Sequence, residues 1–97
     1  MTKFLGQIFE FDPEKAARNL KKHGVSFAEA MTVFNDPLAS TLPDDQHSIE
    51  ENRFITVGMS VRHRILFVVY TETTSGIRLI GARTATAVER RQYEEIK

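Results

Sequence analysis

The stretch ILFVVY, residues 65–70, decides the fold. Consecutive apolar residues, mostly β-branched or aromatic, predict a strand that is buried on both faces in the middle of a sheet. This strand is expected to run from Arg64 to Glu72, and TTSG at residues 73–76 is expected to form the hairpin turn after it. The apolar run is far too short to cross a bilayer.

Shorter apolar patterns on either side predict the other strands of the sheet. They are rich in β-branched residues and lie between segments that contain polar residues, glycine or proline, as strands do. The predicted strands are residues 7–11, 38–42, 53–59 and 77–83, and a polar, acidic loop is expected over residues 43–51.

Two capping motifs near the start predict a helical hairpin. Asp12-Pro13 provides an N-cap and a first helical residue, and Gly24 is expected to close this helix in the left-handed conformation. Ser26-Phe27-Ala28-Glu29 is a capping box that opens a second helix. Asn35-Asp36-Pro37 ends it, because the residue before a proline disfavours the helical conformation.

A second capping box, Thr86–Glu89, starts a C-terminal helix that reaches about Glu95. The predicted order is therefore β-α-α-β-β-β-β-α. Helices followed by consecutive strands indicate an α+β fold, with an antiparallel sheet packed against the N-terminal helical hairpin. The length of 97 residues fits a single domain over residues 1–97.

Composition excludes several classes of site. The chain has no cysteine, so disulfides and thiolate chemistry are absent, and a reducing cytosol is permitted. The N-terminus does not resemble a signal peptide, and we expect a cytoplasmic protein without membrane contact. The three histidines are isolated, and no metal or cofactor is expected. Asp44-Asp45-Gln46-His47 is interpreted as a solvated loop, with a stray divalent ion as the alternative.

The net charge is zero, but the charges are unevenly distributed. Residues 36–52 hold five acidic residues and no base, whereas residues 53–91 hold seven arginines, no lysine and only Glu72 and Glu89 as acids. The planar fork of arginine suits phosphate and carboxylate groups. These arginines are therefore either a phosphate-binding surface or merely solvated and paired with the acidic loop.

Three segments, in their order and spacing, resemble the BrnT family of toxins from bacterial toxin–antitoxin pairs. They are Lys22-His23-Gly24, Ala82-Arg83-Thr84-Ala85 and Glu89-Arg90-Arg91-Gln92-Tyr93. The resemblance extends over roughly residues 8–95. It implies a RelE-like fold and a metal-independent endoribonuclease that cleaves mRNA, free or on the ribosome, and inhibits translation.

The resemblance also implies partners. Toxins of this type pair with a BrnA-type antitoxin that carries a ribbon-helix-helix domain, and the complex binds operator DNA through the antitoxin. The alternative is a non-catalytic binding subunit that completes this autorepression complex on DNA.

Cleavage of RNA without a metal needs a base for the 2′-hydroxyl, an acid for the leaving oxygen and cations for the phosphorane. His23 and Glu72 are candidates for proton transfer. The alternatives are a histidine that caps its helix and an ordinary acid at a strand end. Arg64 shares the strand face of Glu72 but lies about 25 Å from it. Lys22, Arg53, Arg64 and Arg90 are candidate contacts for RNA phosphates, with solvated side chains as the alternative.

Arg83 and Arg78 are the candidates for charge stabilisation. They differ in parity, so a regular strand would direct them to opposite faces of the sheet. We favour Arg83, and its alternative role is a structural pair with Glu89 or Glu72. Tyr93, one helical turn from Glu89, either donates a proton, stacks on a base or anchors the helix on the sheet.

Overall fold

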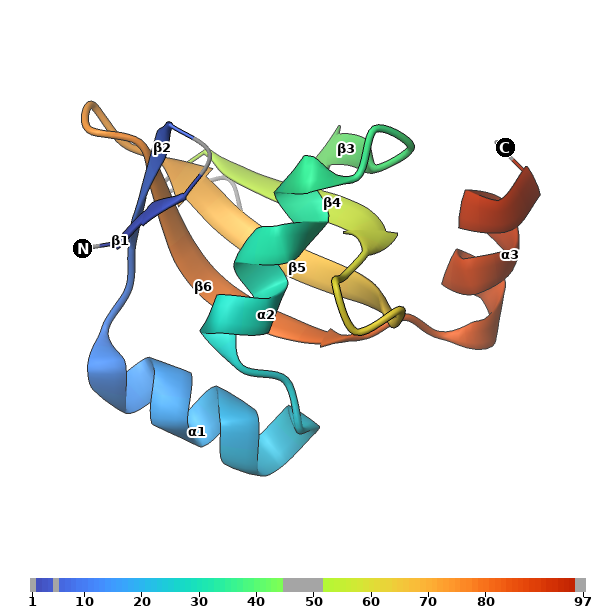
Figure 1. Cartoon of the computed structure of the whole chain (residues 1–97), viewed down its shortest axis with the longest axis horizontal. Coiled ribbons are helices and arrows are strands. Elements are labelled where there is room, and N and C mark those ends of the chain that lie inside the picture. Colours follow the sequence, from blue (N-terminus) through green and yellow to red (C-terminus); the bar gives the residue numbers. More distant parts are fainter. Residues whose placement is uncertain (1, 5, 45–51, 96–97) are drawn as a thin grey trace.

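The computed structural model describes residues 2–4, 6–44 and 52–95, so most of the predicted acidic loop, including Asp45-Gln46-His47, lies outside the described residues. Within them, three α-helices pack on a six-stranded sheet (Figure 1). The strands are β1 (Thr2–Phe4), β2 (Gln7–Glu10), β3 (Ser40–Pro43), β4 (Arg53–Met59), β5 (Ile65–Glu72) and β6 (Ile77–Thr84). The helices are α1 (Pro13–His23), α2 (Phe27–Met31) and α3 (Ala87–Glu95), and a 3₁₀ turn, η1 (Thr32–Asn35), extends α2.

The predicted caps of the helical hairpin are confirmed. The side chain of Asp12 accepts a hydrogen bond from the Glu14 amide at 2.9 Å. Gly24 ends α1 with φ 68°, and the Ser26 hydroxyl accepts from the Glu29 amide at 3.0 Å. These local bonds explain why the helix starts were readable from the sequence.

The N-terminal part of the predicted order is wrong, because β1 precedes the first predicted strand and forms a hairpin with β2. The order of strands in the sheet is β1-β2-β6-β5-β4-β3. From β3 to β6 the strands form the predicted antiparallel meander, but β2 pairs with β6 in parallel, so the sheet is mixed and not antiparallel. This pairing joins segments almost 70 residues apart, which local patterns do not report. The fold is α+β, and its RelE-like placement remains a prediction.

The core lies between one face of the sheet and the α2–η1 segment, which crosses in front of the sheet in Figure 1. Leu66 and Val68 of β5 are fully buried there, together with Phe9 and Val33. Alternation along each strand directs the neighbouring residues to the opposite, open face of the sheet. Only α3 packs against that face among the described helices, over β3 and β4.

Helix α1 lies beside the edge of β6, where β2 no longer pairs with it. The buried Asn19 side chain connects the two: its Nδ2 donates to the Ala82 carbonyl at 2.8 Å, and its Oδ1 accepts from the Ala82 amide at 3.1 Å. Nδ2 also donates to the Val25 carbonyl at 2.9 Å. One side chain therefore fixes α1, the turn after it and β6 relative to one another.

A β-bulge in β6 corrects the prediction for the two arginines of that strand. Arg83 is paired with Phe67 and Arg78 with Thr71, and the register shifts by one residue in between. Residues directly opposite in a sheet share a face, and Phe67 and Thr71 have the same parity. Arg78 and Arg83 therefore lie on the same face, because the bulge inserts one extra residue between them.

No helix in the described part of the chain is long and apolar enough to span a bilayer.

Candidate functional site

A groove between α1 and β6 collects the basic residues of α1. It has a volume of about 370 Å³. Its lining residues are Lys15, Arg18, Asn19, Lys22, His23, Ile80 and Gly81, so no carboxylate of the described residues lines it. The three cationic side chains are exposed, and none has an acidic partner among residues 2–4, 6–44 and 52–95.

The spacing of these residues explains why they line one groove. Lys15, Arg18 and Lys22 follow one another at intervals of three and four, which places them on one face of a helix. Asn19 belongs to the same stripe and holds it against β6. Lys22 and His23 lie in the last turn, where the helix dipole favours positive charge. The groove therefore combines uncompensated cations with a histidine, the residue type that exchanges protons near neutral pH.

Arg83, by contrast, is already bound by the protein. Its Nη1 and Nη2 donate to Oε1 and Oε2 of Glu89 at 2.8 and 3.0 Å, and its guanidinium lies 3.9 Å above the centre of the Phe67 ring. The hydrogen bonds from Arg83 hold the pKa of Glu89 below its usual range. A phosphate at Arg83 would compete with the carboxylate of Glu89.

Arg78 lies on a row of side chains that crosses four strands on the open face. The register places Glu10, Arg78, Thr71 and Arg53 opposite one another on β2, β6, β5 and β4. The Nε of Arg78 is 3.9 Å from Oε2 of Glu10, and half of the Arg78 side chain is exposed. Arg78 and Arg53 thus share one end of the open face, away from the Arg83–Glu89 pair.

Arg64 and Tyr93 are held by structural contacts. Arg64 donates from Nε to Oε2 of the buried Glu29 at 3.0 Å and from Nη2 to the Gly24 carbonyl at 3.0 Å. The hydrogen bonding of Arg64 to Glu29 lowers the pKa of that carboxyl. The Tyr93 hydroxyl donates to Oδ2 of Asp36 at 2.5 Å. Burial, with Asp36 as a second cause, raises the pKa of Tyr93 to about 12. Of the roles considered for Tyr93, this geometry matches the helix anchor.

Glu72 and Arg83 are not brought together. Glu72 is exposed at the end of β5, five residues from Phe67, which pairs with Arg83. Five residues of strand span about 17 Å. Arg90 is exposed on α3 and lines a separate hollow with His63.

Three side chains that were not among the predicted site residues line the pockets of the structure. Lys15 and Arg18 complete the α1 groove, and their helical spacing with Lys22 was the signal that could have identified them. His63 has a left-handed backbone with φ 61° in the turn between β4 and β5, and the residue type alone does not indicate this conformation.

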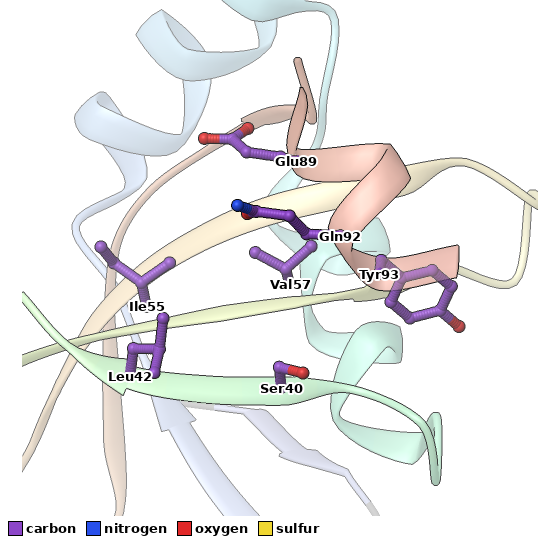
Figure 2. A pocket seen from close by; sticks show the side chains of 7 residues that line it. All are labelled: Ser40, Leu42, Ile55, Val57, Glu89, Gln92 and Tyr93. Carbon is purple, nitrogen blue, oxygen red and sulfur yellow. The ribbon is translucent and has the colours of Figure 1, made fainter. Parts of the chain in front are cut away.

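An apolar groove of about 270 Å³ lies between α3 and the strands β3 and β4. Figure 2 shows Glu89, Gln92 and Tyr93 of α3 on one side and Ser40, Leu42, Ile55 and Val57 on the other. Among the described residues there is no group of three or more His, Cys, Asp or Glu side chains that is placed to hold a metal ion.

Comparisons with known proteins connect this geometry to a family. The crystal structure of the Brucella abortus ribonuclease toxin BrnT matches with a TM-score of 0.63 and 22% identity, over 80% of this chain and 95% of that chain. This likeness shows a shared fold. The comparison with curated proteins gave no match. The family model described as "Ribonuclease toxin, BrnT, of type II toxin-antitoxin system" matches residues 11–89, a span that contains α1, its groove and the Arg83–Glu89 pair. The chain therefore belongs to the BrnT family of ribonuclease toxins.

Proposed function

We propose that this chain is the toxin of a type II toxin–antitoxin pair, a metal-independent endoribonuclease that cuts mRNA in the cytoplasm and so inhibits translation. Family membership supports the general class. The observation that carries the specific proposal is the α1 groove, in which three unpaired cationic side chains and His23 meet without a carboxylate. Such a groove attracts a phosphodiester backbone and repels no part of it.

The proposed reaction uses the 2′-hydroxyl of the RNA as the nucleophile. His23 accepts the proton of this hydroxyl while its oxygen attacks the adjacent phosphorus, and the bond from phosphorus to the 5′-oxygen breaks. The 5′-oxygen takes up a proton from solvent water and His23 later returns its proton to the solvent, so the products are a 2′,3′-cyclic phosphate and a 5′-hydroxyl. Lys22 and Arg18 stabilise the negative charge that develops on the phosphorane oxygens. No step requires a metal ion.

Arg78 and Arg83 extend the proposed RNA-binding surface along β6, on either side of Ile80 and Gly81, which line the groove. In this proposal a phosphate competes with Glu89 for Arg83, which donates two hydrogen bonds to that carboxylate. Substitution of Glu89 by Gln weakens this competition and is expected to tighten binding of RNA. In this proposal Glu72 takes no part in the reaction, because it is not among the described residues that line the groove.

The antitoxin is the second part of the proposal. A BrnA-type antitoxin with a ribbon-helix-helix domain would neutralise the toxin by covering its basic surface, and the complex would bind operator DNA through the antitoxin. Cations without internal partners are the groups that an acidic segment of an antitoxin can bind without breaking existing ion pairs.

The experiment is cleavage of a translated mRNA by purified, antitoxin-free protein in EDTA, with and without ribosomes. Lys22→Ala is compared with Lys21→Ala, which removes the same charge from the same helix outside the groove. His23→Ala and Arg83→Ala are further arms. Cleavage in EDTA that falls in Lys22→Ala and His23→Ala but survives in Lys21→Ala supports the proposal.

Equal activity of Lys21→Ala and Lys22→Ala would place the site elsewhere. If the folded wild-type protein cuts RNA in neither condition, the enzymatic proposal is wrong. The binding subunit would then be the better account, and the internal engagement of Arg64, Arg83 and Tyr93 already favours that alternative.

A further inference from the structure

A second hollow, separate from the α1 groove, opens where the β4–β5 turn meets α3. Its volume is about 340 Å³. Met59, Ile65 and Ala85 give it an apolar lining, and His63 and Arg90 contribute polar, basic side chains. In the part of the chain that the structure describes, no carboxylate lines it. A partly apolar hollow with basic groups suits a flat, anionic ligand.

The backbone of His63 gives an independent indication. The turn is a tight hairpin loop, in which the Ser60 amide donates to the Arg64 carbonyl at 2.8 Å and the His63 amide to the Ser60 carbonyl at 2.9 Å. His63 occupies the left-handed position of this loop, where glycine is the usual residue. Its exposed side chain has no hydrogen-bond or ion-pair partner among the residues that the structure describes. Among the described residues, no hydrogen bond or ion pair of the imidazole therefore compensates the strain, and strained positions of this kind gather at functional sites.

We propose that this hollow binds the base of one unpaired nucleotide of the RNA, and this inference rests on the proposed function. An imidazole ring and a guanidinium plane both stack on bases, and unpaired bases are what proteins read in single-stranded RNA. The apolar lining shields the faces of the base from water, and the positive charge of Arg90 attracts the adjoining phosphate.

The position of the hollow fits one continuous strand of RNA. Thr84 lines the hollow, and Gly81, three residues earlier on β6, lines the α1 groove. Three residues of strand span about 10 Å. Arg83 lies between them and donates from Nη1 to the Thr84 carbonyl at 3.2 Å. An RNA backbone that follows β6 therefore meets the groove and the hollow in succession, so the hollow would select which nucleotide flanks the cut.

The first test measures binding of AMP, GMP, CMP and UMP to the wild-type protein through changes in its NMR chemical shifts. His63→Gly removes the imidazole and also relieves the strained backbone, so loss of binding cannot come from a less stable fold. We expect at least one nucleotide to bind and to bind about fivefold or more weakly in His63→Gly, the size expected for a lost stacking contact. Arg90→Ala should weaken binding as well. The control, Arg91→Ala on the same helix, lies outside the hollow and should bind like the wild type.

The second test sequences the ends produced from a pool of RNAs with randomised sequence. A preference of the wild type at one position that disappears in His63→Gly but persists in Arg91→Ala supports the inference. Cleavage with an unchanged preference in His63→Gly overturns the inference and leaves the proposed function intact. If the wild type cuts no RNA, the binding test alone decides: nucleotide binding that requires His63 supports the hollow, and no binding overturns it.

Discussion

The basic residues of α1 and the arginine Arg83 at the end of β6 are used differently by the protein. On α1, Lys15, Arg18 and Lys22 face a groove without a carboxylate. Next to α3, Arg83 is bound through both terminal nitrogens by Glu89, and Tyr93 anchors the same helix to Asp36. The difference teaches that a basic residue without an acidic partner is a stronger candidate for binding than one that the protein has already neutralised.

The largest expected effect is on the rate of RNA cleavage, which should depend on the α1 groove and not on the contact that anchors α3. His23→Ala should lower the rate of RNA cleavage about 10²- to 10⁴-fold, the usual contribution of a general acid or base. Tyr93→Phe should lower stability and leave the cleavage rate close to that of the wild type, because its hydroxyl is buried against Asp36. The measurement is single-turnover cleavage by variants that circular dichroism shows to be folded. If the cleavage rate fell more in Tyr93→Phe than in His23→Ala, the comparison would be reversed.

The second prediction concerns stability. Arg64→Ala leaves the carboxylate of Glu29, of which only 4% of the side chain is exposed, without its main partner. The free energy of unfolding should fall by about 3 kcal/mol, as is usual when one partner of a buried ion pair is removed. Arg18→Ala on α1, which has no such partner, should change it by less than about 0.5 kcal/mol. Urea denaturation of both variants measures the contrast, and similar losses would contradict it.

The third prediction is a dependence of stability on pH. The pKa values of Glu29 and Glu89 are lowered mainly by hydrogen bonds from Arg64 and Arg83. Each carboxylate therefore contributes stability above its ordinary pKa of 4.5, and that contribution is lost as the pH falls through the lowered value. The free energy of unfolding, measured at a series of acidic pH values, should fall less steeply with falling pH in Glu89→Gln than in the wild type. Lys22→Ala should retain the wild-type dependence of stability on pH. A weaker dependence in that variant would mean that an acidic group pairs with Lys22, which would contradict a groove without carboxylates.

The smallest expected effect is on salt dependence. If Lys15 contacts one phosphate, Lys15→Ala should reduce the slope of log binding constant against log salt by about 0.7, the value for one contact to a single strand. Lys21→Ala should leave the slope unchanged. Fluorescence anisotropy with a labelled RNA oligonucleotide at several salt concentrations tests this, and equal slopes for both variants would remove Lys15 from the site.

Local chemistry determined how much was predictable from sequence. The caps of α1 and α2 connect residues two or three positions apart, and both were read correctly. The partners of Arg64 and Tyr93 lie 35 and 57 residues away, so no local pattern indicates them. The bulge in β6 made the prediction for Arg78 and Arg83 wrong for a different reason. Parity assumes a regular strand, and one extra residue places both side chains on the same face.

Asn19 has a further consequence for the whole molecule. By donating to the carbonyl of Ala82 and accepting from its amide, this side chain occupies the groups through which another chain would extend the sheet at β6. Unpaired strand edges invite aggregation and domain swapping. The Asn19 side chain therefore protects the protein from polymerising along this edge. It belongs to α1, the same helix that carries the cations of the groove. Replacement of Asn19 would therefore threaten solubility as well as the groove.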